Sequence, residues 1–201
     1  MDNLNKAVGS TAQLLQRKFL GLHGESEQAH ARGTLAELRR NVGRPIESDP
    51  LGLSRVLLTL DPPLDQEPLG KEDASTASER AAYHALTLFS WHMQSAREPL
   101  HILDRSFATA CGKLYWNEEL KSIKPRFDAM ALAGSERSRL QRLRELIALL
   151  RGKRLGFDYG QFAVDLRALE NPRLRRKVLM KWGADFARRS SDNSEETPEN
   201  Q

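Results

Sequence analysis

The chain has 201 residues and a mass of 22.7 kDa, with 39% hydrophobic residues, 29% charged residues and a formal net charge of +4. This composition fits a globular protein with a buried core, and it excludes a chain that is disordered throughout. No apolar run reaches the roughly 18 residues of a membrane span, and the first residues lack the pattern of a secretory signal. The lone cysteine, Cys111, excludes an intramolecular disulfide and a cysteine zinc cage, so we expect a cytoplasmic protein without a membrane partner.

Charge is distributed unevenly along the chain. Residues 190–201 hold four acids and no Lys or Arg, whereas residues 137–189 hold fifteen Lys and Arg against five acids. A strongly cationic end is typical of proteins that bind a polyanion. A soluble basic surface without a partner is the alternative.

The N-terminal half has the 3.6-residue periodicity of helices. In the basic segment HARGTLAELRRNVGR, Leu35 and Leu38 are expected to face inward. Asp49 and Pro50 then start a helix, and residues 61–77, with three prolines and five acids, are predicted to form an exposed loop. Ser78 is the expected N-cap of a central helix, SERAAYHALTLFSWHMQS, whose second half is apolar nearly all round and is therefore predicted to be buried.

The C-terminal half continues the helical pattern. We expect a helix over 103–120, a connector over 124–134, a helix from the cap Ser135 to Gly152, another from the cap Asp158, and a last one from Pro172. No period-two run flanked by turn signals predicts a strand. The fold class is therefore predicted to be all-α, with two small helical bundles in one elongated chain: an N-terminal bundle over 1–125 and a C-terminal bundle over 126–189. The polar segment 190–201 is predicted to be a disordered acidic tail.

The last helix is amphipathic. Leu174, Val178, Trp182 and Phe186 form an i, i+4 stripe that we expect to be buried, while Lys and Arg cover the opposite arc. Arg175 falls inside the apolar arc, where it needs a carboxylate or carbonyl partner because an unpaired buried charge is costly.

Other cations form rows as well. Arg137, Arg144 and Arg151 are seven residues apart in the sequence, so they line one flank of a helix at steps of about 10 Å. Arginine suits phosphate because the guanidinium stays charged and presents several donors; solvated helix faces with local Glu–Arg pairs are the alternative. Twelve cations are our candidate nucleic-acid contacts: Arg32, Arg39, Arg40, Arg137, Arg144, Arg151, Lys153, Arg154, Arg173, Arg176, Lys177 and Lys181. Trp91, Trp116 and Trp182 could stack on bases, but their helical spacing favours the core, to which we assign Trp182.

Motifs for chemistry are missing from the sequence. The histidines lack a metal-binding spacing, and His84 and His92 are expected to be hydrogen-bonded near the core. No glycine-rich phosphate loop or nucleophile elbow occurs. Asp158, Asp165 and Asp185 are interpreted as a helix cap, half of a surface pair and an arginine partner. We therefore predict no catalytic residue, no metal and no cofactor, and an enzyme is the minor hypothesis.

Four segments together resemble the CasB family, the small subunit of the type I-E CRISPR surveillance complex called Cascade. ARGTLAELRR is similar to the basic N-terminal helix of that family, and ALTLFSWHMQS to its central helix, which typically reads LFALHQQS; Met93 replaces the first glutamine. FDYGQFAVDLRAL and RRKVLMKWGADFARR resemble its C-terminal Asp–aromatic, basic and Trp…Asp–Phe pattern. The resemblance runs from about residue 31 to residue 188.

This resemblance implies a non-catalytic, all-helical protein present as two copies beside other Cascade subunits, the guide RNA and the target DNA. It also implies that the basic face holds the displaced single-stranded non-target DNA. A protein that holds any displaced strand has to bind the backbone, which carries no sequence information. The alternative is a stand-alone helical DNA-binding regulator with residues 172–189 in a major groove, which would prefer one duplex sequence.

Overall fold

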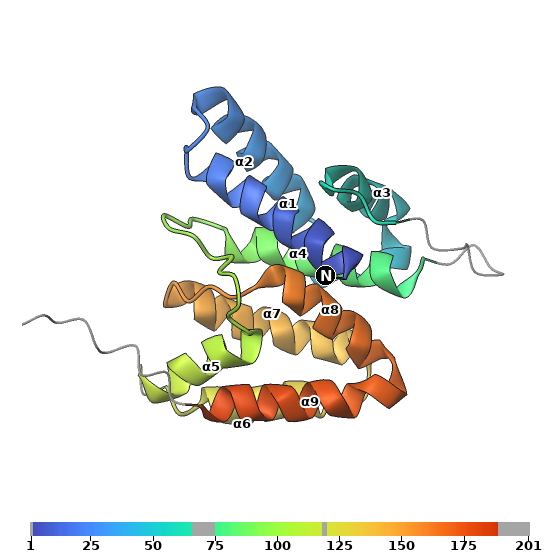
Figure 1. Cartoon of the computed structure of the whole chain (residues 1–201), viewed down its shortest axis with the longest axis vertical. Helices are drawn as coiled ribbons and strands as arrows, with labels where there is room; N and C mark the ends of the chain where they lie inside the picture. The colour runs from blue at the N-terminus through green and yellow to red at the C-terminus, as the bar shows by residue number, and fades with distance from the viewer. Residues whose placement is uncertain (1, 66–74, 118–119, 189–201) are drawn as a thin grey trace, which may run out of the picture.

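The computed structural model describes residues 2–65, 75–117 and 120–188. The described residues form nine α-helices and a short 3-10 turn, with a single isolated β-bridge between His101 and Phe157, so the predicted all-helical class is confirmed (Figure 1). The helices are α1 (Asn3–Phe19), α2 (Glu25–Arg39), α3 (Pro50–Thr59), α4 (Ala77–His92), α5 (Phe107–Trp116), α6 (Ile123–Ala131), α7 (Glu136–Gly152), α8 (Tyr159–Glu170) and α9 (Pro172–Ala187); the turn is Ile46–Ser48. The predicted acidic tail and residues 66–74 of the predicted loop lie outside the described residues.

Helices α4 and α8 form the centre of the molecule. In Figure 1, α1 and α2 lie at one end of the long axis, α5, α6 and α9 at the other, and α8 packs against α1, α4 and α9. The crossing of α1 and α8 depends on glycine, because a Cβ built on Gly160 would lie 2.5 Å from the carbonyl oxygen of Asn5. The buried apolar residues of both ends belong to one connected core. The boundary between bundles at 125/126 stays a prediction.

Most helix ends follow the predicted caps. Ser135 and Asp158 accept hydrogen bonds from the backbone N–H groups of Ser138 and Gln161, and α7 ends at Gly152 as expected. The predicted cap of α4 was wrong. A helix capped by Ser78 would begin at residue 79, whereas α4 begins at Ala77 with Thr76 as its N-cap. Thr76 and Glu79 form a capping box, in which each side chain accepts a hydrogen bond from the other residue's backbone N–H.

The segment 124–134, predicted to be a connector, is largely helical. Helix α6 places Ile123, Phe127 and Met130 on one buried face against α7. Pro125 is tolerated because it lies in the first turn, where a backbone N–H has no intrahelical partner. The helix expected over 103–120 is also shorter than predicted: Ser106 caps α5 by accepting from the N–H of Thr109, and α5 ends at Trp116.

Helix α9 carries its apolar stripe as predicted, except at its first turn. Val178, Trp182 and Phe186 are buried, but Leu174 is 47% exposed and its predicted burial was wrong. α9 packs on α5 around Phe186, whose carbonyl oxygen would lie 2.4 Å from a Cβ on Gly112. Leu174 lies more than two turns before Trp182, near the start of the helix. Arg175 finds the predicted carbonyl, because its Nε donates to the oxygen of Leu169 at 2.8 Å.

Asp165 differs from its predicted role in a surface pair. It is 4% exposed, and its Oδ2 accepts a hydrogen bond from the indole Nε1 of Trp182 at 2.7 Å. Burial raises the pKa of Asp165, and the hydrogen bond from Trp182 opposes that rise. The carboxylate is therefore a buried acceptor that orients the tryptophan. Oδ1 of Asp185 lies 3.5 Å from Nη1 of Arg188, so Asp185 has the predicted role of an arginine partner.

The two histidines of α4 are hydrogen-bonded near the core, as predicted. His84 Nε2 lies 3.1 Å from Glu136 Oε1, and His92 Nδ1 lies 2.9 Å from the hydroxyl oxygen of Tyr159. Burial, with a smaller contribution from the charge of Arg151, lowers the pKa of His92 to about 3. His92 is therefore neutral in the folded protein near neutral pH.

We expect this histidine to make stability fall in mild acid. Below pH 6.5 the unfolded chain binds a proton that folded His92 does not accept until about pH 3, so folding free energy is lost as pH decreases through this window. Relative to His92→Gln, the wild-type protein should lose about 1.4 kcal/mol per pH unit below pH 6. Urea unfolding at several pH values measures the difference. If the free energies of unfolding of the two proteins changed in parallel with pH, His92 would not be a buried neutral residue.

Candidate nucleic-acid interface

The C-terminal end of α4 carries a tryptophan between two arginines of α7. The Cζ atom of Arg144 lies 4.8 Å from the centroid of the Trp91 ring, and that of Arg151 lies 4.3 Å from it. Both side chains reach one ring because they are seven residues apart and share a flank of the helix. Cations at this distance from an indole are attracted by the negative face of the ring.

Carbonyl oxygens hold two arginines in place here, Arg151 and Arg39. Nη1 of Arg151 donates to the oxygen of Trp91 at 3.2 Å and to Oε1 of Gln94 at 2.9 Å. Nε of Arg39, from α2, donates to the oxygen of Ser90 at 3.1 Å. Three helices thus contribute to one site. We call the set Arg39, Trp91, Arg144 and Arg151 the Trp91 cluster.

Two positive charges of the Trp91 cluster, on Arg39 and Arg151, repel each other. Burial, followed by the positive charge of Arg151, lowers the pKa of Arg39. Arginine stays protonated despite such shifts, so Arg39 and Arg151 stay close together as cations, and hydrogen bonds to neutral carbonyls hold each of them in place. An anion placed between them would relieve this repulsion. The cluster therefore brings cations together without a carboxylate among its four residues.

Other candidate cations extend the cluster along α2 and α7. Arg32 is exposed two turns before Arg39, and Arg40 is exposed beside it. Arg137 lines a small cavity together with residues of the segment 43–47. Arg144 lies near the same segment, because a Cβ built on Gly43 would be 4.0 Å from Cδ and Nη1 of Arg144. Lys153 and Arg154 are exposed just beyond α7. Five of the twelve candidates thus lie on α2 and α7, and three more follow the C-terminal ends of these two helices.

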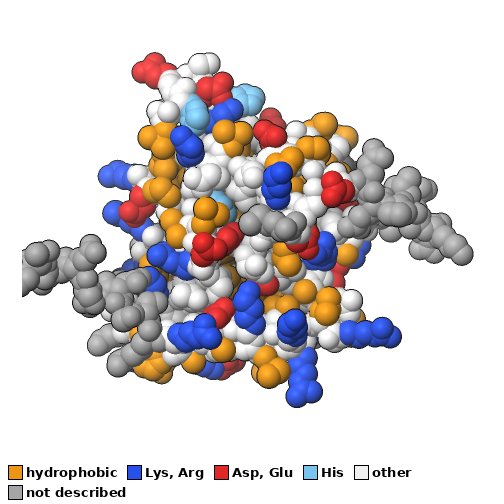
Figure 2. Space-filling model, viewed as in Figure 1, with side chains coloured by type: hydrophobic (Ala, Val, Ile, Leu, Met, Phe, Trp, Pro, Cys, Tyr) orange, Lys and Arg blue, Asp and Glu red, His pale blue; other side chains and the backbone are white. Residues whose placement is uncertain are grey.

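The other four candidates form a separate group on α9. Arg173, Arg176, Lys177 and Lys181 are exposed, and we call them the α9 strip. Figure 2 shows Lys and Arg side chains along the lower edge of the molecule, and Figure 1 places α9 at the opposite end of the long axis from α2. Nζ of Lys181 is 3.9 Å from Asp165, a loose contact. The twelve candidate cations therefore lie on two separate surfaces of the molecule.

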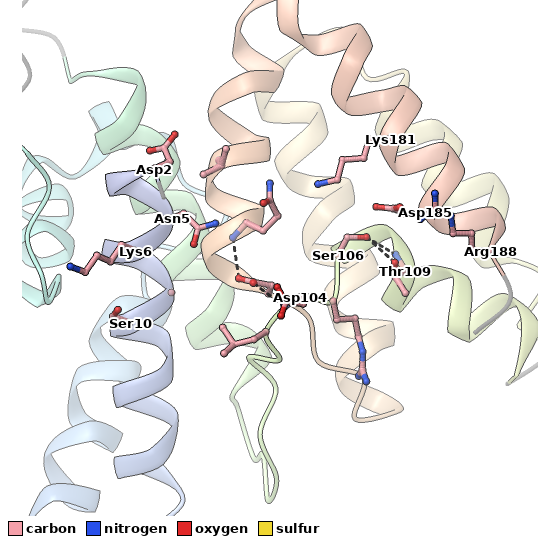
Figure 3. A pocket seen from close by; sticks show the side chains of 16 residues that line it. Asp2, Asn5, Lys6, Ser10, Asp104, Ser106, Thr109, Lys181, Asp185 and Arg188 are labelled. Carbon is pink, nitrogen blue, oxygen red and sulfur yellow. Dashed lines mark hydrogen bonds and ion pairs between the residues drawn. The ribbon is translucent and has the colours of Figure 1, made fainter. Parts of the chain in front are cut away.

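A cavity of about 780 Å³ lies between α1, the starts of α5 and α8, and the end of α9. Figure 3 shows Asp2, Asn5 and Lys6 on one side of it and Lys181 and Asp185 on the other. Several of its charges are already paired, Asp2 with Arg167 and Asp185 with Arg188. Acids and bases are balanced there, so it lacks the charge bias of the Trp91 cluster.

Among the described residues, no group of three or more His, Cys, Asp or Glu could hold a metal ion. None of the helices in the described ranges is long and apolar enough to cross a membrane. Sequence reasoning had counted Trp91 with the buried part of its helix, although the ring is half-buried and flanked by cations.

A known protein family matches most of the chain. The model of the family "CRISPR-associated protein Cse2" matches residues 34–186, a range that includes the whole Trp91 cluster. The chain belongs to the Cse2 family. The predicted resemblance is thereby confirmed.

Two solved structures share the fold. The crystal structure of CasB from Thermobifida fusca is 26% identical, with a TM-score of 0.75, over 92% of this chain and 98% of that one. The crystal structure of a Cse2-family CRISPR-associated protein from Thermus thermophilus is 22% identical, with a TM-score of 0.60, over 90% of this chain and 97% of that one. No curated protein sequence matches the chain. The Cse2 fold therefore accounts for nearly the whole chain.

Proposed function

We propose that this Cse2-family chain is a non-catalytic small subunit of a type I-E CRISPR Cascade complex. In this role it works in the cytoplasm beside other Cascade subunits and a second copy of itself, in defence against viral DNA. It binds the backbone of the displaced non-target strand and of the guide RNA, and so stabilises the R-loop. The Trp91 cluster is the observation that carries the proposal.

The chemistry of the cluster suits backbone binding. Its donors are guanidinium groups, which pair with phosphate oxygens through parallel hydrogen bonds. Because R-loop formation exchanges one duplex for another of similar stability, modest protein–backbone contacts can decide whether the open state persists. Phosphate contacts carry no sequence information, and a subunit that serves every target requires that property.

A stand-alone DNA-binding regulator is the second candidate, and the α9 strip favours it. Helix α9 is 16 residues long and exposes four candidate cations on the outside of the molecule. A surface helix of this kind can enter a major groove. Such a protein would bind duplex DNA and would distinguish one sequence from another.

Binding to unrelated single strands and duplexes of equal length separates these candidates. We expect single strands of different sequence to bind with affinities equal within about threefold, because backbone contacts dominate. We also expect the chain to join the other Cascade subunits in a complex that purifies intact. Strong preference for one duplex sequence, with no incorporation into Cascade, would support the regulator instead.

A further inference from the structure

A second cavity adjoins the Trp91 cluster. Its volume is about 540 Å³, and it lies between the segment that follows α4 and the C-terminal end of α7. Arg151 and Gln94 line it, and these two residues are hydrogen-bonded to each other at 2.9 Å. The wall of the cavity is therefore also an edge of the Trp91 cluster. We call this cavity the Arg97 pocket; its other polar lining residues are Ser95, Arg97, Glu98 and Arg154.

The Arg97 pocket has an excess of positive charge with free donors. Three arginines face one carboxylate. Arg97 makes no hydrogen bond or ion pair with any described residue. Arg154 is 70% exposed and lies 3.7 Å from Glu98, too far for a firm hydrogen bond. Most donors of these two guanidinium groups are therefore available to a ligand.

The backbone holds both walls of the pocket in an unusual conformation. Ser95 has φ 62° and Arg154 has φ 55°, in the left-handed region that glycine favours. Arg154 follows the end of α7, where a glycine would commonly occupy this conformation. An arginine there bears strain that a glycine would avoid, and such strain is concentrated at binding sites.

We propose that the Arg97 pocket binds one phosphate group of the strand that crosses the Trp91 cluster. Arg97 and Arg154 are the phosphate ligands, and Arg151 joins the pocket to the cluster. This inference rests on the proposed function and adds to it a path for the strand, from Arg144 past Trp91 and Arg151 to the end of α7. Glu98 weakens the site, because it competes with phosphate for Arg154.

Four substitutions in the full-length chain test the pocket. Arg97→Gln and Arg154→Gln should each lower the log–log slope of single-strand affinity against salt by about 0.7, the value for a single phosphate contact. Glu98→Gln should strengthen binding by about two- to fivefold, the range of an exposed ion pair.

Arg154→Gly should raise the melting temperature, because glycine relieves the strain, and should still weaken strand binding. Arg126→Gln, an exposed arginine on α6, is the matched control and should change none of these values.

The outcomes separate the pocket from the proposed function. Arg144→Gln tests the Trp91 cluster by the same assay. If Arg144→Gln lowers the slope while Arg97→Gln and Arg154→Gln leave it unchanged, the cluster binds the strand and the pocket does not. If none of the three changes it, both proposals fail. Unchanged or weaker binding by Glu98→Gln would also overturn the pocket.

The phosphate could belong to a free nucleotide rather than to a strand. Calorimetric titration with thymidine monophosphate alone distinguishes the two sources. We expect no measurable binding at millimolar nucleotide, because a lone phosphate gains nothing from the neighbouring Trp91 cluster. Tight nucleotide binding that Arg97→Gln abolishes would instead make the pocket a mononucleotide site and overturn the strand path.

Discussion

Replacing Trp182 with alanine should lower the free energy of unfolding by about 3–5 kcal/mol, as truncation of large buried aromatic residues does. The side chain is 0% exposed, and its ring centroid lies 5.4 Å from that of Phe107 and 6.3 Å from that of Phe127. The truncation leaves a cavity between these rings. It also removes the N–H that bonds Asp165, which leaves a buried carboxylate short of a donor and adds to the loss.

Urea unfolding followed by circular dichroism measures this change. Met180→Ala is the matched control, because Met180 lies on the same helix two residues away and is 66% exposed. It should change stability by less than about 0.5 kcal/mol. Trp182→Phe should fall between the two, since it keeps most of the ring packing and loses the hydrogen bond to Asp165. A Trp182→Ala protein as stable as wild type would mean that the side chain is exposed.

Features with a local cause were predictable from the sequence. The buried stripe at Val178, Trp182 and Phe186 follows from i, i+4 spacing, and the caps at Ser135 and Asp158 follow from their side-chain chemistry. The failure to predict α6 has a tertiary cause. α6 was missed because Pro125 and the flanking glycine resembled a connector, while the burial of Phe127 against its neighbours depends on contacts distant in the sequence.

The candidate site shows the same limit. The seven-residue spacing of Arg144 and Arg151 predicted a row of cations, and the structure places that row on α7. Nothing in the sequence says that the row meets Trp91, because that contact depends on how α7 packs against α4. Arg97 was overlooked because it lies outside any helix, between the expected elements. The sequence feature that could have identified Arg97 is an arginine a few residues after the C-terminal end of a helix.

Substitution of the α7 row should have the largest effect on binding. We expect Arg137, Arg144 and Arg151 replaced together by alanine to lower the log–log salt slope by about 2, or about 0.7 for each phosphate that the variant no longer binds on a single strand. The loss should be similar for DNA of any sequence. Arg144 and Arg151 also pack on Trp91, so the variant should lose about 0.5–1 kcal/mol of stability for each of these two side chains and still fold.

The matched variant replaces Arg173, Arg176 and Lys177 of the α9 strip by alanine. These side chains are exposed, so the fold should be unaffected. If both surfaces touch nucleic acid, each triple variant flattens the salt dependence; if the strand lies only along α2 and α7, the α9 variant behaves as wild type. The comparison thus assigns the strand to one surface or to both, which charge counting cannot do.

The decisive measurement is R-loop yield on a matched target, in Cascade assembled with wild-type or variant subunit, at several salt concentrations. Loss of backbone contacts should reduce the yield, and the difference from wild type should shrink as salt rises, because the variant has fewer salt-sensitive phosphate contacts to lose. The pattern of tolerated mismatches should not change, since guide pairing and not this subunit reads the target. If both triple variants assembled normally and opened DNA as well as wild type at every salt concentration, the arginines around Trp91 would serve stability alone.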